Sequence, residues 1–177
     1  MVSCNCNYIL AGSGCICNYF HETLSGMIQL PDSKGRAWAL LLSAQARLVD
    51  AIEADLARAD LPPLAWYDLL WELEKAAGGR LRMHQLAHRI VLSRSNLSRL
   101  ADRLEGAGLI AREDCPEDGR GYRLAMTRAG RAMRKRMWPV YAAAIERLFA
   151  KHVTLEEAHS IAEALGRVIQ AARKSGP

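Results

Sequence analysis

Aromatic residues and long apolar runs are scarce in this sequence of 177 residues. Phe, Trp and Tyr make up only 6%, although half of the residues are hydrophobic. This balance excludes a disordered chain and, with Ala and Leu dominant, favours a mainly helical protein of about one domain with extensions. No apolar run approaches the roughly 18 residues of a membrane span. Residues 1–17 lack the basic start of a signal peptide, so we expect a cytoplasmic protein with reduced cysteines.

Catalytic motifs are absent as well. The sequence has no nucleophile beside a base, no glycine-rich phosphate loop and no pair of carboxylates at a catalytic spacing. His84 and His88 stand four residues apart, which suits a metal on a helix, but neither an intervening Glu nor a third ligand accompanies them. We therefore expect neither an enzyme nor a bound cofactor.

Acidic residues are missing from one stretch in particular. Between Arg80 and Ala101 there are five arginines and no Asp or Glu. An acid-free surface that carries arginines is suited to a polyanion, and the net charge of +5 agrees with this; abundant acid would instead have favoured a protein partner. The apolar residues of the stretch have the spacing of two short helices that cross at a tight turn, as in a helix-turn-helix. They are Leu86, Ile90, Leu92, Leu97, Leu100 and Leu104.

Helical spacing continues on both sides of this stretch. Before it, residues 36–60 and 64–77 place apolar side chains on one face, and residues 31–35 are expected to form a linker. After it, Thr127 is placed to cap a long helix, and Thr154 begins a capping box that starts a last helix.

Three segments have the alternation of short strands. They are residues 80–82, 109–113 and 121–126, and residues 114–120 read as a polar hairpin tip between the last two. The predicted fold class is mainly α with a small β-hairpin. It consists of a winged helix-turn-helix core plus long N- and C-terminal dimerisation helices, whose apolar surface exceeds what one small core needs.

The hairpin carries the most specific motif. Residues 118–127 read Asp-Gly-Arg-Gly-Tyr-Arg-Leu-Ala-Met-Thr. This segment resembles the wing signature of the MarR family of winged helix-turn-helix transcription regulators, in which Asp-x-Arg precedes an apolar strand and a helix that starts at Thr. Residues 99–112 are similar to that family's recognition-helix exit, and residues 67–70 to its second helix. The resemblance covers about residues 36–172.

The resemblance implies a domain organisation and a function. Residues 36–60 and 128–173 would form the dimerisation helices of a homodimer, and residues 61–127 its winged helix-turn-helix DNA-binding domain. The homodimer would bind a pseudo-palindromic operator in double-stranded DNA, usually as a repressor. A small ligand held between the dimer region and the winged module, or in some members cysteine oxidation, would release it.

Side chains suited to reading DNA gather on the second helix of the arginine-bearing stretch. Arg can pair with guanine, Asn with adenine, and Ser with base or phosphate. Because Leu97 and Leu100 are expected to face inward, the polar residues beside them face outward. The family resemblance points to Arg120 as a minor-groove contact of the wing, with Asp118 orienting the wing through an ion pair. The candidate DNA-binding residues are Arg94, Ser95, Asn96, Ser98, Arg99 and Arg120, with Arg82, Arg89 and Arg112 as phosphate contacts; a solvated surface is the alternative for each.

A ligand site is expected where aromatic side chains of the first two helices accompany one acid. Trp38, Trp66, Tyr67 and Asp68 are candidates for the wall of a cleft that takes a small aromatic or acidic ligand. Residues at this helical spacing also serve as core, and that alternative stays open.

Residues 1–30 form an N-terminal extension with an internal repeat. Cys4-Asn-Cys-Asn-Tyr8 recurs eleven residues later as Cys15-Ile-Cys-Asn-Tyr19. Cys4, Cys6, Cys15 and Cys17 could bind a soft metal or act as a redox switch, which would make the regulator respond to metal or oxidant. The alternative is a disordered tail, or upstream sequence translated from a start before Met27.

Overall fold

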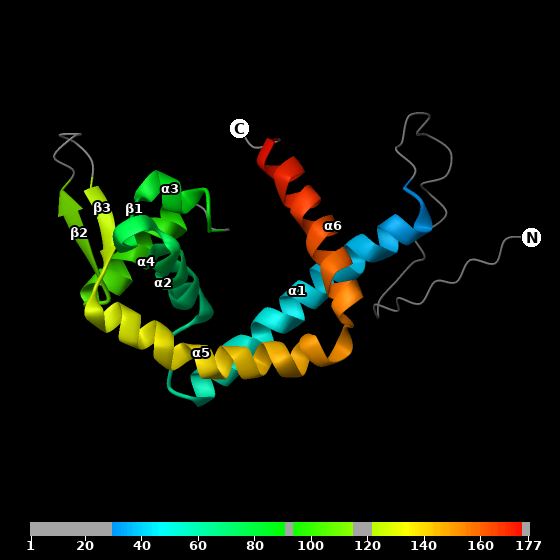
Figure 1. Cartoon of the computed structure of the whole chain (residues 1–177), viewed down its shortest axis with the longest axis horizontal. Coiled ribbons are helices and arrows are strands. Elements are labelled where there is room, and N and C mark those ends of the chain that lie inside the picture. The colour runs from blue at the N-terminus through cyan, green and yellow to red at the C-terminus, as the bar shows by residue number, and fades with distance from the viewer. Residues whose placement is uncertain (1–29, 91–93, 115–121, 175–177) are drawn as a thin grey trace, which may run out of the picture. The chain divides into compact units, whose positions relative to one another are not determined.

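The computed structural model describes residues 30–90, 94–114 and 122–174. They form a mainly helical chain with one small antiparallel sheet, as predicted (Figure 1). Along the chain the elements are α1 (Asp32–Arg58), α2 (Leu64–Lys75), the short helix η2 (Ala77–Gly79), β1 (Arg80–Arg82), α3 (Met83–Ala87), α4 (Arg94–Gly106), β2 (Ile110–Asp114), β3 (Tyr122–Met126), α5 (Arg128–Leu148), the short helix η3 (Ala150–His152) and α6 (Leu155–Lys174).

The first helix begins earlier than the sequence pattern predicts. A linker over residues 31–35 is wrong, because α1 is helical from Asp32. Pro31 has a fixed φ that suits a helix start, and the acid of Asp32 lies in the first turn, where it interacts favourably with the helix dipole. The chain divides into two compact units, residues 1–41 and 42–177, so α1 begins in one and ends in the other.

The sheet has the strand order β1-β3-β2, and both pairings are antiparallel. Leu124 in β3 lies opposite Leu81 in β1 and opposite Arg112 in β2. Because directly opposed residues point to the same face of a sheet, these three side chains share one face. Leu81 and Leu124 belong to the buried core, so this face of the sheet is the one that packs on the helices.

A first hydrophobic core joins α2, α3, α4 and the sheet. Of the apolar residues that the spacing assigns to the helix-turn-helix core, Leu86, Leu97, Leu100 and Leu104 are confirmed as buried. Ile90 is only partly buried, and Leu92 lies outside the described residues. The buried members are Leu69, Leu70, Leu73, Leu81, Leu86, Leu97, Leu100, Ala101, Leu104, Leu109, Ile110, Leu124 and Met126.

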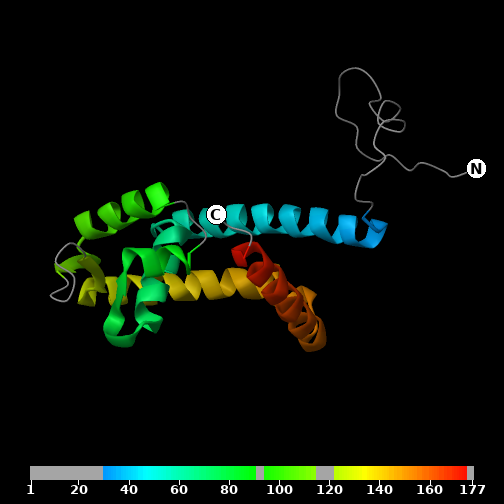
Figure 2. The same ribbon diagram turned by 90° about the horizontal axis from the view of Figure 1, so that it is seen from above.

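A second core joins the end of α1 to α2 and α5. Ile52 and Leu56 of α1 pack with Tyr67 of α2 and with Met137 and Ala144 of α5. The later part of α1 runs beside α5 in both views (Figures 1 and 2). This core links the winged module to the long helices, because α5 leaves the sheet directly after β3.

The last helix, α6, differs from the helices of the two cores in the burial of its residues. The capping box at its start is confirmed, since the Glu157 N–H donates to Thr154 Oγ1 at 3.2 Å and the Thr154 N–H donates to Glu157 Oε2 at 2.8 Å. None of the residues of α6 is buried. Its large exposed hydrophobic residues are Leu155, Ile161, Val168 and Ile169. No helix among the described residues is long and apolar enough to cross a membrane.

Candidate nucleic-acid interface

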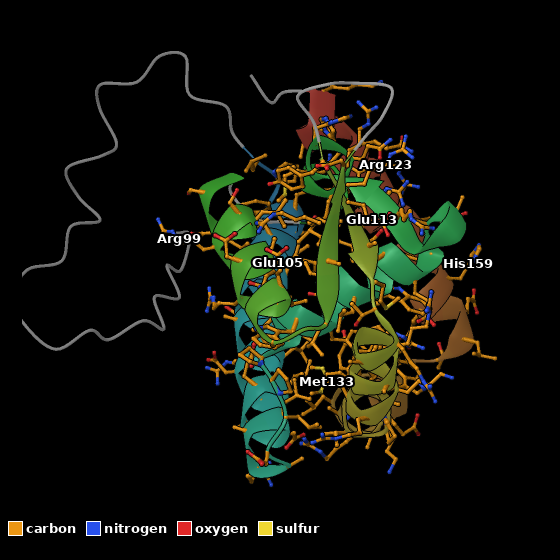
Figure 3. All side chains as sticks on the ribbon, turned by 90° about the vertical axis from the view of Figure 1, so that its left-hand side faces the viewer. Arg99, Glu105, Glu113, Arg123, Met133 and His159 are labelled. Atoms are coloured by element: carbon orange, nitrogen blue, oxygen red, sulfur yellow. The ribbon has the colours of Figure 1, made fainter. Side chains whose placement is uncertain are left out.

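Helix α4 separates apolar and polar residues as the sequence predicts. Leu97 and Leu100 are buried in the first core, whereas Ser95, Asn96 and Arg99 are exposed. Figure 3 shows Arg99 projecting from the side of α4 that faces away from the sheet. The first turn of α4 contains no acid. The outer side of this helix therefore offers hydroxyl, amide and guanidinium groups to a partner; the exposed polar residues are Ser95, Asn96, Ser98 and Arg99.

Two further candidate arginines, Arg82 and Arg89, precede α4 in the chain. Arg82 ends β1 and is half-buried, and its backbone N–H donates to Gln85 Oε1 at 3.0 Å at the start of α3. Arg89 is exposed, and its Nη1 lies 3.8 Å from Glu72 Oε2. A single pair at this long separation contributes little energy, so the exposed Arg89 remains accessible to a phosphate.

Arg112 has different surroundings from the other arginines. Its Nη1 and Nη2 form ion pairs with Glu105 Oε2 and Asp102 Oδ1 of α4, and its Cζ lies 5.1 Å from the ring centroid of Tyr122. In Figure 3 Glu105 lies on the side of α4 next to the sheet. The sequence motifs gave no individual role to Asp102, Glu105 or Tyr122. The sequence does suggest that Asp102 and Glu105 could share one positively charged partner, because they stand three residues apart on one side of a helix.

The opposite face of the sheet also carries a charge pair. Arg80 Nε donates to Glu113 Oε2 at 2.6 Å, and Nη2 donates to Glu113 Oε1 at 3.3 Å. Figure 3 labels Glu113 on the sheet. The hydrogen bond from Arg80 lowers the pKa of Glu113, and the positive charge of Arg123 adds to the effect. The charge of Glu113 is thus paired within the sheet, which reduces its repulsion of a polyanion.

Several predicted residues fall outside the description. Arg120 and Asp118 at the hairpin tip lie outside the described residues, as do Cys4, Cys6, Cys15 and Cys17. Arg94 begins α4, but its side chain is outside the description too. Within residues 30–90, 94–114 and 122–174, no three His, Cys, Asp or Glu side chains gather as a metal site.

The candidates for a ligand site have different surroundings. Trp38 is exposed and lies in the first compact unit, whereas the other three lie in the second. Trp66 packs against the first core, and Tyr67 is buried in the second. Adjacent residues on a helix point about 100° apart, which explains why these two rings face different cores.

Tyr67 lies at the centre of a cluster of aromatic rings from α2 and α5. Its centroid lies 6.4 Å from Trp71 and 6.1 Å from Trp138, both in stacked orientation, and 5.1 Å from Tyr141, edge to face. Trp138 and Tyr141 belong to α5, so only the packing of α5 on α2 reveals the cluster. Arg134 of α5 lies over the other end, with its Cζ 5.1 Å from the Trp71 centroid.

Asp68 adjoins this cluster. Burial, together with the nearby charges of Glu72 and Glu53, raises the pKa of its carboxyl to about 6. Burial also raises the pKa of Tyr141, to which the charge of Asp68 contributes. No described side chain forms an ion pair with Asp68. The cluster therefore combines exposed ring surface with a carboxyl that is readily protonated near neutral pH.

We expect Asp68→Asn to raise the free energy of unfolding at pH 7.5 by about 1 kcal/mol, less than the full shift implies because solvent screens a partly open group. The pKa of Asp68 is higher in the folded chain than its ordinary 3.8. The carboxyl therefore stabilises the fold only while protonated, and this contribution is lost as pH rises from about 4 to 6. Urea unfolding at pH 4 and at pH 7.5, at equal chain concentration, measures the effect.

The matched control is Asp50→Asn, because Asp50 is an exposed acid of α1. It should change the free energy of unfolding little at either pH. For Asp68→Asn the gain should be much smaller at pH 4, where the folded wild type carries the protonated carboxyl and the unfolded chain is partly protonated. A gain of the same size at pH 4 and pH 7.5 would contradict the assignment.

The arrangement of α3, α4 and the hairpin defines a class of protein. Two consecutive short helices share one core, the second presents a polar and cationic side, and an antiparallel hairpin follows it. This is the winged helix-turn-helix, a DNA-binding fold.

Comparison with known proteins identifies the family. A family model described as the MarR family matches residues 59–121. Sco3205 of Streptomyces coelicolor, a MarR family transcriptional regulator solved in complex with DNA, is 30% identical, with a TM-score of 0.76 over 84% of this chain and 92% of that chain. AbsC, from the same organism and family, is 29% identical, with a TM-score of 0.76 over 84% of this chain and 100% of that chain. The chain belongs to the MarR family of transcriptional regulators, which are not enzymes.

A more distant structure shares the fold alone. BpsR of Bordetella bronchiseptica is 20% identical, with a TM-score of 0.67 over 81% of this chain and 97% of that chain. No curated protein matches the sequence.

Proposed function

We propose that this regulator is a homodimeric repressor. It binds a pseudo-palindromic operator through α4 and the hairpin of each protomer, and a small aromatic ligand at the Tyr67 ring cluster releases it. The single observation that carries the proposal is the outer side of α4. Ser95, Asn96, Ser98 and Arg99 are exposed together there, and the first acid of the helix is Asp102.

The chemistry of this side matches the edges of base pairs. A guanidinium can donate two hydrogen bonds to guanine, and an amide can pair with adenine in the major groove. An acid on the same side would repel phosphate, and the first two turns have none. Sco3205, which was solved in complex with DNA, supports the same use of the fold. Arg120 is proposed to enter the minor groove, with Asp118 orienting the wing.

Exposed apolar surface supports the dimer. Helix α6 is 20 residues long and none of them is buried, although Leu155, Ile161 and Val168 are exposed hydrophobic residues on it. Exposed apolar surface of this extent marks an interface in a protein that folds in water. A two-fold dimer also fits a DNA site made of two half-sites.

The Tyr67 ring cluster supports release by a ligand. Trp71 and Trp138 are partly exposed, and Asp68 offers a carboxyl that can accept or donate a hydrogen bond. Aromatic surface with one polar anchor is the usual composition of a small-molecule site. DNA binding by BpsR is regulated by 6-hydroxynicotinic acid, an aromatic compound. Trp66 packs against the first core and Trp38 belongs to the first compact unit, so Tyr67 and Asp68 carry the proposed site.

The proposal is tested on DNA from upstream of the protein's own gene. The wild type should protect a pseudo-palindrome there, and 2,4-dichlorophenol serves as a first aromatic probe for its release. Arg99→Ala should cost about 1–3 kcal/mol of operator binding and relax the sequence preference, because a base contact is lost. Titration of operator and random duplexes at fixed ionic strength measures both quantities.

Arg103→Ala is the matched control. It removes the same charge from the last turn of the same helix, where the Arg103 Nε donates to the Arg99 carbonyl at 3.3 Å. It should weaken both duplexes slightly and alike. The proposal of specific reading fails when wild-type protein binds operator and random DNA equally at every salt concentration.

A further inference from the structure

Arg112 lies where the recognition helix meets the wing. It is in the middle of β2, directly opposite Leu124, and so points to the face of the sheet that packs on the helices. Its side chain is 29% exposed. The turn at Gly106 to Gly108 brings β2 back alongside α4, and Gly108 has a φ of 71°, which glycine adopts without strain.

The guanidinium of Arg112 is engaged on three sides. Nη2 pairs with Asp102 and Nη1 with Glu105, both from α4, while the ring of Tyr122 lies 5.1 Å from Cζ. Tyr122 is the first residue of β3 and lies opposite Asp114, the last residue of β2. One side chain therefore connects the C-terminal half of the recognition helix to the base of the hairpin.

These contacts leave little for a phosphate. A planar guanidinium has a fixed fork of donors, and here the fork is directed at two carboxylates. The hydrogen bond with Asp102 raises the pKa of Arg112 and the charge of Glu105 adds to it, although burial opposes both. A DNA phosphate would have to displace an anion that is already in contact.

Apolar packing alone does not fix the angle between α4 and the wing. Leu100 and Leu104 bury one side of the helix, but hydrophobic contact has no preferred direction. Asp102 and Glu105 stand on the neighbouring side, and their pairing with a planar fork is directional. The ion pairs therefore supply the orientation that the leucines do not.

We propose that Arg112 is a positioning residue, which holds α4 at a fixed angle to the hairpin so that the two can enter adjacent grooves of DNA together. This assignment rests on the proposed DNA-binding function. It replaces the expectation that Arg112 contacts phosphate.

The sharpest test is Asp102→Asn, because the two explanations give opposite signs. This change removes a negative charge from a side chain that is 61% exposed on the recognition helix. Were Asp102 merely an acid near DNA, its removal would strengthen binding to every duplex. If Asp102 instead helps Arg112 to orient α4, its removal should weaken operator binding about tenfold, which is the loss expected when a good base contact is misplaced. Binding to random DNA should be unchanged or slightly stronger.

A second variant separates charge from geometry. Arg112→Lys keeps the positive charge but lacks the planar fork. It should lose sequence preference as far as Arg112→Gln does. A phosphate contact would instead be largely retained in Arg112→Lys and lost in Arg112→Gln for operator and random DNA alike.

Glu146→Gln is the matched control, because it removes an exposed acid from α5. It should leave the ratio of operator to random binding unchanged. Circular dichroism and unfolding midpoints check that each variant is folded. The positioning role of Arg112 is overturned if the wild type binds the operator selectively and Asp102→Asn is equally selective, or binds both duplexes more tightly. The proposed function would still stand in that case. Absence of any duplex binding by the wild type overturns both.

Discussion

Gly130→Ala should destabilise the fold by about 3 kcal/mol, the upper range for overpacking a tight site. A Cβ built on Gly130 would lie 2.1 Å from the Leu109 carbonyl oxygen and 3.1 Å from Leu70 Cδ2. The first of these is a backbone atom, which cannot turn aside as a flexible side chain can. Either the start of α5 or the strand entry at Leu109 must move.

The displaced carbonyl also has partners to lose. The Leu109 oxygen accepts from the Thr127 N–H at 3.1 Å and from Thr127 Oγ1 at 3.0 Å. Thr127 Oγ1 in turn accepts from the Gly130 N–H at 3.0 Å, which caps α5. Alanine would therefore disturb the helix cap and the contact between α4, β2 and α5 at once. Loss of a cap alone costs about 1 kcal/mol.

Chemical unfolding at equal chain concentration measures this effect, since the stability of the proposed dimer would depend on concentration. The matched control is Gly106→Ala at the end of α4, where a new Cβ meets nothing within 4 Å. That variant should be as stable as the wild type or slightly more stable, because alanine is the better helix former. An unchanged unfolding midpoint for Gly130→Ala would show that the backbone contact is not as close as described.

The spacing of apolar residues predicted most of the fold. Leu97, Leu100 and Leu104 follow a helical repeat, and all three are buried. The strand at residues 80–82 and the capping box at Thr154 are where local sequence signals place them. These features could be predicted because each depends on neighbours within one or two turns, where periodicity and hydrogen-bonding side chains decide the structure.

The surroundings of Arg112 could not be predicted in the same way. Counting arginines treats each one as free for DNA, but Asp102 is ten residues from Arg112 in the chain. The two meet only because the turn at Gly108 folds β2 back along α4. The ring cluster around Tyr67 has the same origin, since Trp138 comes from α5. Contacts between distant segments depend on tertiary packing, about which composition and periodicity say little.

Charging the apolar side of α6 should dissociate the proposed dimer. Ile161 and Val168 are seven residues apart, so they lie on one side of the helix, and both are exposed. Introducing Ile161→Glu with Val168→Glu places two negative charges there. A buried, unpaired charge in an apolar interface is strongly unfavourable. Light scattering of the purified protein should therefore change from the mass of two chains to that of one.

Operator binding should fall with the dimer, by about 100-fold or more. Two linked modules bind two half-sites with a large gain in effective concentration, and a monomer loses that gain. The winged module itself should stay folded, because none of the residues of its core comes from α6. Binding of the variant to a single half-site should therefore match that of one wild-type module.

The control places the same two charges on the opposite side of the helix, as His159→Glu with Gln170→Glu. His159 lies 3.3 Å from Glu163, but both side chains are well exposed, so losing that pair costs little. This variant should remain a dimer and bind the operator normally, apart from a small loss from its added negative charge. A dimeric Ile161→Glu, Val168→Glu protein would place the interface elsewhere. Equal dissociation of both variants would mean that charge, rather than the apolar side of α6, governs assembly.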